Sequence, residues 1–235
     1  LPPTLIMQIT TSDRSFNSSR KNNINSSVAP WFSYIAYPLG RHIILPFYFG
    51  KITVTGRENL PQNTPIILAP TLRSRWDAFM IAFAAGRDIT GKEMRFMVSH
   101  DEMTGLQGFF VRWFGGFPVD TKKPNISSLR HVIDLLKQKE TLVIFPEGNI
   151  FREEQIQPLK QGLARMALQT ESMQPGLNIK IVPIRLKYAE PFPQKGCDVN
   201  INIGIPLNVA DYDITKIKQS SQKLTDDLAQ RLQKL

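Results

Sequence analysis

Cysteine and histidine are scarce in this chain. Cys197 is the one cysteine, and there are three histidines among 235 residues. An internal disulfide is therefore impossible, and no cluster of zinc ligands stands out. A single free cysteine fits a reducing compartment without establishing one. The Gly-x-Ser-x-Gly sequence is also missing, and its absence argues against a serine hydrolase built on a nucleophile elbow.

Acidic residues are fewer than basic ones. The chain has 20 Asp and Glu against 29 Lys and Arg, which gives a net charge of +9. This excess favours anionic partners such as phosphate head groups, an acidic carrier protein or an anionic membrane surface. The basic residues are scattered and no aromatic nucleic-acid motif accompanies them, so we expect no nucleic-acid partner.

Residues 1–29 lack hydrophobic periodicity. They are rich in Ser and Asn, and we expect a mobile polar tail. Leu1-Pro2-Pro3 has no basic start and no apolar core after it, so it does not open a secretory signal.

Residues 30–50 are the most apolar stretch, but they lack an uninterrupted run long enough for a clean transmembrane span. Arg41 and His42 lie in the middle, and Pro38 and Pro46 interrupt the pattern. Two interpretations stay open: short helices at a membrane interface, or ordinary helices packed on the core. Aromatic residues near both ends of the stretch favour the interface.

Residues 51–235 are long enough for one α/β domain, and the 42% hydrophobic content of the chain is ordinary for a globular core. Apolar patterning predicts strands at 51–55, 65–69, 95–99, 117–120, 141–145, 179–187 and 198–203. Helices are predicted at 78–85, 104–114, 125–139, 163–169 and 214–235. The last two strands are joined by a loop with Pro and Gly, so we expect an antiparallel pair. The sheet is then mixed, mostly parallel and flanked by helices.

A polar, basic turn follows the strand at 65–69, and a helix pattern opens at about Ser74. Strand, polar turn and helix form the layout in which α/β proteins place chemistry at a strand's carboxyl end. Ser74-Arg75-Trp76-Asp77 also has the form of a capping box, with Ser74 capping the helix. Taken alone, this purely structural interpretation is the commoner one for so short a motif.

Four short blocks follow one another in order. Asp77 is followed by Gly115-Gly116-Phe117-Pro118-Val119-Asp120, then Phe145-Pro146-Glu147-Gly148, then Val182-Pro183-Ile184. The series resembles the motif blocks of the glycerolipid acyltransferase family, whose type members are lysophosphatidate acyltransferases. The resemblance covers about residues 50–190. The block around Glu147 is the most specific of the four, and the Val-Pro block is the weakest.

The resemblance implies transfer of a fatty acyl group from a thioester donor to the free hydroxyl of a lysophosphatidate-like acceptor in phospholipid synthesis. The donor is acyl-CoA or an acyl carrier protein. The apolar stretch at 30–50 and the net charge of +9 favour association with a membrane, so the expected location is peripheral or monotopic on the cytoplasmic side. No metal and no bound cofactor is implied. Backbone N–H groups at the helix start are expected to hold the oxyanion.

One position departs from the family pattern. The family's first block is a His, four residues, then the Asp; here that His is Leu72. In the family the imidazole takes a proton and the Asp orients it, so the catalytic pair would be position 72 and Asp77. Leucine neither accepts a proton nor hydrogen-bonds a carboxylate. The change is a deliberate replacement, the mark of a natural lipid-binding relative, or a sign that another base serves, with His100 the first candidate.

Several residues fit the family's substrate-binding positions. Thr121 stands where the family has an arginine for the acceptor's phosphate, and Lys122 and Lys123 follow it, although they are also explained as a solvated pair. Glu147 either binds the acceptor's glycerol or orders the site, and Arg152 takes the role of an arginine two positions earlier. The remaining matches are Arg73, Ser74, Gly148 and Lys160. The retention of Arg73, Asp77, Glu147, Gly148 and Lys160 favours an altered acyltransferase, impaired by Leu72, over a natural pseudoenzyme.

Overall fold

The computed structural model describes residues 34–35, 38–99, 117–119, 126–138 and 140–235. Within these ranges, strands pair into one mixed sheet in the order β1-β7-β6-β2-β5-β3-β4, with β8 on β6. Only β6–β7 and β6–β8 are antiparallel among the described pairs. The strands are β1 (Ile52–Thr55), β2 (Ile66–Pro70), β3 (Met94–Ser99), β4 (Phe117–Val119), β5 (Thr141–Ile144), β6 (Lys180–Tyr188), β7 (Val199–Ile203) and β8 (Leu207–Asn208). The predicted mixed, mostly parallel sheet is confirmed.

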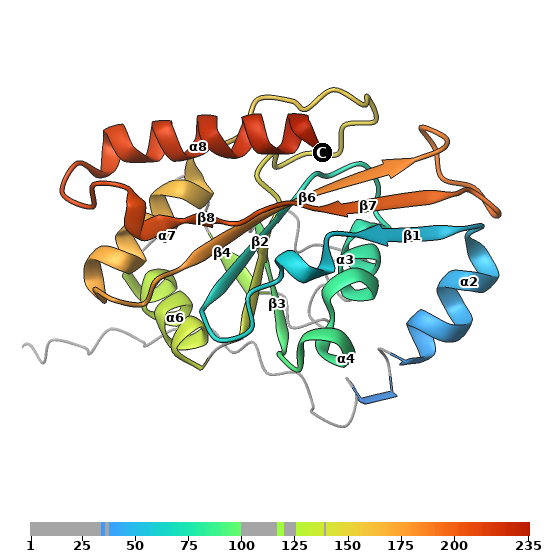
Figure 1. The fold of residues 1–235 in the computed structure, drawn as a ribbon, viewed down its shortest axis with the longest axis horizontal. Coiled ribbons are helices and arrows are strands. Elements are labelled where there is room, and N and C mark those ends of the chain that lie inside the picture. Colours follow the sequence, from blue (N-terminus) through green and yellow to red (C-terminus); the bar gives the residue numbers. More distant parts are fainter. Residues whose placement is uncertain (1–33, 36–37, 100–116, 120–125, 139) are drawn as a thin grey trace, which may run out of the picture.

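Helices cover both faces of the sheet (Figure 1). One layer packs α6 (Ile126–Lys137), α7 (Gly162–Met173) and α8 (Ile217–Lys234) on the strands. The other is built on α3 (Asp77–Ala85), with α4 (Arg87–Thr90) beside it. Short 3-10 turns lie at η2 (Arg57–Asn59) and η4 (Val209–Asp211). The protein is therefore a three-layer α/β domain.

The central strand β2 contributes to both layers. Ile67 and Ala69 belong to the core under α6 and α7, whereas Ile66 and Leu68 belong to the core under α3. Successive side chains of a strand point to opposite faces, so a strand covered on both sides needs an unbroken apolar run. The run from Ile66 to Pro70 is fully buried, and it leads the chain directly to the polar turn at its carboxyl end.

The N-terminal apolar stretch contains a π-helical turn, η1 (Gly40–Ile44), that continues into α2 (Leu45–Tyr48). Pro46 has no N–H for the carbonyl four residues back, and the wider π turn lies directly before it. Arg41, which interrupts the apolar pattern, pairs with Asp88 and lies 4.8 Å from the centre of the Phe83 ring. Among the described residues, no helix combines the length and apolar character needed to cross a bilayer.

Most predicted elements match the described ones within a few residues, including the antiparallel pair β6–β7. The helix predicted at 104–114 lies outside the described residues. The sequence pattern predicts that the helix opens at about Ser74; α3 itself begins at Asp77, and the residues from Ser74 to Trp76 form the turn that leads into it.

Candidate active site

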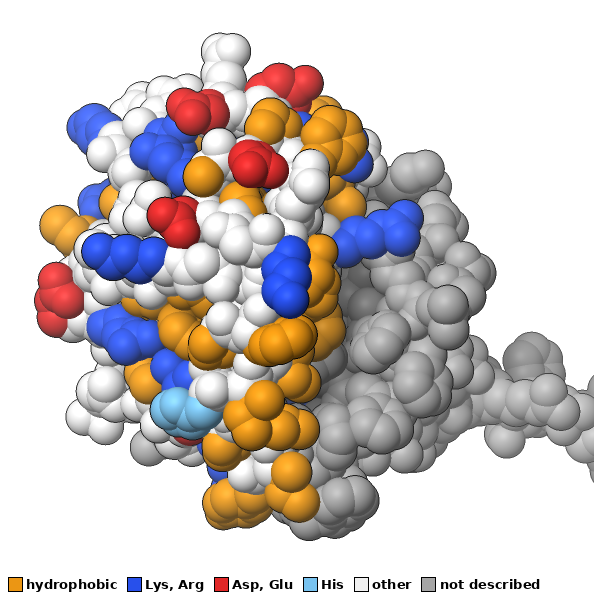
Figure 2. Space-filling model, turned by 90° about the vertical axis from the view of Figure 1, so that its right-hand side faces the viewer, with side chains coloured by type: hydrophobic (Ala, Val, Ile, Leu, Met, Phe, Trp, Pro, Cys, Tyr) orange, Lys and Arg blue, Asp and Glu red, His pale blue; other side chains and the backbone are white. Residues whose placement is uncertain are grey.

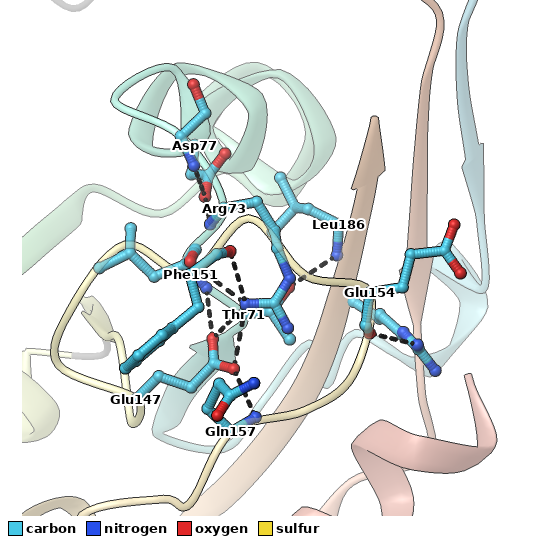
Figure 3. A network of polar contacts seen from close by, with 11 residues as sticks. Thr71, Arg73, Asp77, Glu147, Phe151, Glu154, Gln157 and Leu186 are labelled. Carbon is cyan, nitrogen blue, oxygen red and sulfur yellow. Dashed lines mark hydrogen bonds and ion pairs between the residues drawn. The ribbon is translucent and has the colours of Figure 1, made fainter. Parts of the chain in front are cut away.

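The loop between β2 and α3 is fastened to the neighbouring strand at its first residue. The Thr71 N–H donates to the Ile184 carbonyl at 2.9 Å, and the Thr71 hydroxyl accepts a hydrogen bond from Leu186 N–H at 3.0 Å. Thr71 is fully buried. The start of the loop that carries residues 72–76 is therefore fixed against β6 (Figure 3).

Asp77 organises the rest of this loop. Its Oδ2 atom accepts hydrogen bonds from the backbone N–H groups of Arg73 and, at 2.9 Å, Ser74. Its Oδ1 atom accepts a hydrogen bond from the Tyr188 hydroxyl at 2.6 Å. Burial raises the pKa of Asp77 to about 6, against the opposing effects of the Tyr188, Ser74 and Arg73 hydrogen bonds. The carboxylate is thus buried and ordered, and with this pKa it is mostly ionised at neutral pH.

The N–H groups at the helix start have partners inside the loop. Those of Arg73 and Ser74 bind Asp77, and the Trp76 N–H donates to Ser74 Oγ at 3.2 Å. The Asp77 N–H donates to the Ser74 carbonyl at 3.2 Å. Ser74 Oγ accepts from the Trp76 N–H and Asp77 accepts the Ser74 N–H, which are the two reciprocal bonds of the predicted capping box. The expectation that N–H groups at the helix start hold the oxyanion is wrong for these four.

A buried ion pair joins the first block to the Phe-Pro-Glu-Gly turn. Arg73 Nη1 lies 3.0 Å from Glu147 Oε1 and 2.8 Å from Oε2, and both side chains are almost wholly buried. Glu147 also accepts hydrogen bonds from Leu72 N–H at 2.8 Å and Gln157 N–H at 3.1 Å (Figure 3). A buried pair is stable only when such additional bonds offset the loss of hydration. The pair orders both loops.

The turn after Glu147 favours glycine because its backbone is left-handed. Gly148 has φ +69°, and a Cβ atom there would meet the Lys160 side chain at 2.4 Å from Nζ. The Lys160 N–H donates to the Pro146 carbonyl at 2.8 Å. The Lys160 side chain therefore passes over the turn, close to the Cα atom of Gly148.

Leu72 is held through its main chain. Its N–H donates to Glu147, and its carbonyl accepts a hydrogen bond from Phe151 N–H at 2.9 Å. The side chain is half-buried and carries no group that takes a proton. Position 72 thus lies in a fixed backbone frame beside the ordered Asp77, but it supplies no base.

Not all of the predicted site residues are described by the structure. Seven of them lie together at the carboxyl edge of the sheet: Leu72, Arg73, Ser74, Asp77, Glu147, Gly148 and Lys160. Arg152 follows Phe151 on the same loop, is exposed, and lies 4.4 Å from the centre of the Phe192 ring. Thr121, Lys122, Lys123 and His100 lie outside the described residues. The substrate contacts of all these residues stay predictions.

Sequence reasoning missed Tyr188. It is the last residue of β6, the strand that pairs with β2 in parallel up to Pro70 and Ile184. Polar residues at the carboxyl ends of adjacent parallel strands meet at one edge of a sheet. This rule could have identified Tyr188 from the sequence, but only if β6 had been known to lie beside β2.

The fold and this edge define an α/β protein whose polar site is built at the carboxyl ends of its central strands. The family model described as acyltransferase matches residues 51–187, which is more than half of the chain. The chain belongs to the acyltransferase family.

Individual relatives are similar over most of the chain. The 1-acyl-sn-glycerol-3-phosphate acyltransferase of Streptococcus pneumoniae is 25% identical, over 91% of this chain and 76% of its own length. The protein of that name from Bacillus subtilis is 28% identical, over 79% of this chain and 88% of its own. The crystal structure of PlsC, the 1-acyl-sn-glycerophosphate acyltransferase of Thermotoga maritima, has a TM-score of 0.53 at 17% identity. It covers 84% of this chain and 77% of its own, and this likeness shows the fold.

Proposed function

We propose that this acyltransferase is built to move a fatty acyl group from a thioester to the free hydroxyl of a lysophosphatidate-like acceptor, and that Leu72 impairs the reaction. The family membership and the names of the two bacterial relatives support the reaction class. The single observation that carries the proposal is the ordered Asp77 carboxylate beside the fixed main chain of residue 72.

The chemistry needs a base at position 72. An alcohol near neutral pH is a poor nucleophile, and an imidazole that removes its proton raises the rate. A carboxylate then orients the imidazole and stabilises its charged form, and we assign this role to Asp77. The alcohol oxygen attacks the thioester carbonyl, the C–S bond breaks, and the leaving thiolate receives the proton from the imidazolium. Acyl-CoA and acyl carrier protein are both donors of this chemistry, and the reaction proposed uses no metal or bound cofactor.

Recognition of the acceptor's phosphate falls to exposed cations. Arg73 is buried and already paired with Glu147, so we assign these two residues to ordering the site. Arg152 and Lys160 are exposed on the same loop system, and Lys122 and Lys123 are the further predicted contacts. An exposed cation binds a phosphate at a smaller cost than a buried one that is already paired with a carboxylate.

The proposed working surface is an anionic membrane. Figure 2 shows hydrophobic side chains gathered on the face that carries α2, with Lys and Arg around them. The exposed apolar side chains near this helix include Ile43, at 60% exposure, and Phe47, at 73%. Lys195 lies 4.3 Å from the centre of the Phe47 ring. Apolar and cationic groups on one face are the combination that binds anionic bilayers peripherally. We place the chain on the cytoplasmic side.

Product analysis tests the function. The purified chain and its Leu72→His variant are each incubated with acyl-CoA or acyl carrier protein thioester and lysophosphatidate, and the lipids are identified by mass spectrometry. Phosphatidate formed by the histidine form and nearly absent from the leucine form supports the proposal. Lysophosphatidate binding without product from either form favours the alternative, a non-catalytic lipid-binding relative. Leu72→Gln is the matched control because it is polar without being a base.

A further inference from the structure

Tyr188 is the side-chain partner that the structure gives to Asp77. The Tyr188 hydroxyl donates to Oδ1 at 2.6 Å, while two backbone N–H groups occupy Oδ2. One residue ends β6 and the other begins α3, so the bond ties the sheet to the helix. Each oxygen of the carboxylate is thus held from a different direction, which fixes its plane.

The ring of Tyr188 is itself held in place by aromatic packing. Its centroid lies 6.2 Å from that of Phe49, and Phe49 lies 5.3 Å from Trp76 in an edge-to-face contact. Trp76 directly precedes Asp77. Aromatic contacts of this kind restrict the ring, so the hydroxyl is presented to Oδ1 without a further loss of freedom.

The hydroxyl stays a donor at working pH. Burial, together with the neighbouring Asp77, raises the pKa of Tyr188 well above its ordinary value. Cys197 raises the same pKa, and a hydrogen bond from Ser74 lowers it. A neutral phenol therefore faces the carboxylate throughout the neutral range.

The charge of Asp77 depends on this donor. Burial raises the pKa of Asp77, and the largest opposing effect is the Tyr188 hydrogen bond, ahead of those from Ser74 and Arg73 and the charge of Arg73. A carboxylate that became protonated would neither orient an imidazole nor stabilise its charged form. Removing the hydroxyl therefore weakens the ionised form selectively.

We propose that Tyr188 is a positioning residue for acyl transfer, whose hydroxyl holds the Asp77 carboxylate in the orientation and charge state that a base at position 72 requires. This inference rests on the proposed function, since it acts through Asp77 on that base. In the Leu72 chain the same bond keeps the buried carboxylate satisfied while no imidazole is present.

The first experiment compares three forms that all carry Leu72→His: the single variant, one with added Tyr188→Phe, and one with added Tyr48→Phe. Phenylalanine keeps the ring at 188 and removes only the hydroxyl. We expect Tyr188→Phe to lower kcat by about 10-fold, with little change in thioester KM, and to move the acid limb of the pH–rate profile upward by about one to two units. Tyr48 belongs to the same aromatic cluster, and its substitution should change neither quantity.

The second experiment does not depend on catalysis. Urea unfolding of the Leu72 chain is measured from pH 4 to 8, with Asp77→Asn as the reference that removes this titration. We expect Tyr188→Phe to raise the pH at which the Asp77 contribution levels off by about one to two units. If Tyr188→Phe leaves that pH unchanged, the proposed role of Tyr188 is wrong. Absence of transfer by Leu72→His instead contradicts the proposed function, so the two failures are distinct.

Discussion

Arg73 and Glu147 face each other across the carboxyl edge of the sheet, with Arg73 Nη1 2.8 Å from Glu147 Oε2 and both side chains almost wholly buried. They come from loops after β2 and β5, which are paired in parallel. Because Glu147 also accepts a hydrogen bond from the Leu72 N–H, the residue that pairs with Arg73 also fixes the main chain of residue 72. The two motif blocks are therefore one structural unit.

Replacing only one partner of the Arg73–Glu147 pair should lower the free energy of unfolding. Glu147→Gln leaves the Arg73 charge buried with a neutral partner, and we expect a loss of about 3–5 kcal/mol in the free energy of unfolding. Arg73→Met combined with Glu147→Gln should cost less than the sum of the single changes, because it leaves no unpaired buried charge. Urea unfolding of the four forms measures this coupling. Glu153→Gln, at an exposed position, is the control, and additive losses would show that the pair is not coupled.

The pair formed by position 72 and Asp77 is tested by combining changes. Leu72→His should raise acyl transfer by roughly 10²–10⁴-fold, the usual contribution of general-base catalysis. Leu72→His with Asp77→Ala should give back most of that gain, because the imidazole loses its orienting carboxylate. Release of free thiol from the thioester, with and without lysophosphatidate, measures the rate. A leucine form as fast as the histidine form would point to another base, with His100 examined first.

Asp77 should make stability depend on pH. Its pKa is about 6 in the folded chain against an ordinary 3.8, so the folded state binds more protons between these values. Stability is therefore greatest below about pH 4, falls as the pH rises to about 6, and stays at the lower level above it. The loss from this group is at most about 3 kcal/mol. Asp77→Asn should remove this part of the pH dependence in urea unfolding. A slope that is unchanged in the variant would assign the effect to another group.

Arg152 should act on the acceptor alone. In the Leu72→His form, Arg152→Ala is expected to raise the KM for lysophosphatidate about 10- to 100-fold, because a charged hydrogen bond to phosphate is lost, and to leave the thioester KM unchanged. Arg130→Ala, at an exposed position of α6, controls for net charge. Steady-state kinetics with each substrate varied in turn gives both constants. An effect confined to the thioester would move Arg152 to the donor site.

Membrane binding should depend on the apolar face near α2. Ile43→Ser combined with Phe47→Ser is expected to reduce co-flotation with vesicles that contain anionic phospholipid, since both side chains are exposed. Ile205→Ser removes an equally exposed isoleucine from the β7–β8 connection and should have no effect. Salt should weaken only the electrostatic part of the binding. Equal flotation of both variants would exclude this face as the contact surface.

The sheet could be predicted from local pattern because its strands have simple surroundings. The run from Ile66 to Pro70 and that from Thr141 to Ile144 are buried on both faces, and unbroken apolar runs of this length are typical of such strands. The antiparallel pair β6–β7 could be predicted from its connecting loop. These features depend on residues close together in the sequence.

The partners within the site could not be predicted in the same way. The Asp77–Tyr188 bond joins residues 111 positions apart, and their meeting depends on β6 lying next to β2. The Arg73–Glu147 pair depends similarly on β5 lying on the other side of β2. Strand order is a tertiary property, whereas hydrophobic periodicity reports only which residues are buried.

The main-chain anchoring of Leu72 has an evolutionary consequence. The hydrogen bonds that shape its loop use backbone atoms of residue 72 and side chains of its neighbours, so the architecture of the loop is insulated from the identity of that side chain. Leucine and histidine codons differ by a single base in some cases. If residue 72 is the base, as proposed, a single nucleotide change is enough to remove or restore that base while the loop keeps its main-chain hydrogen bonds.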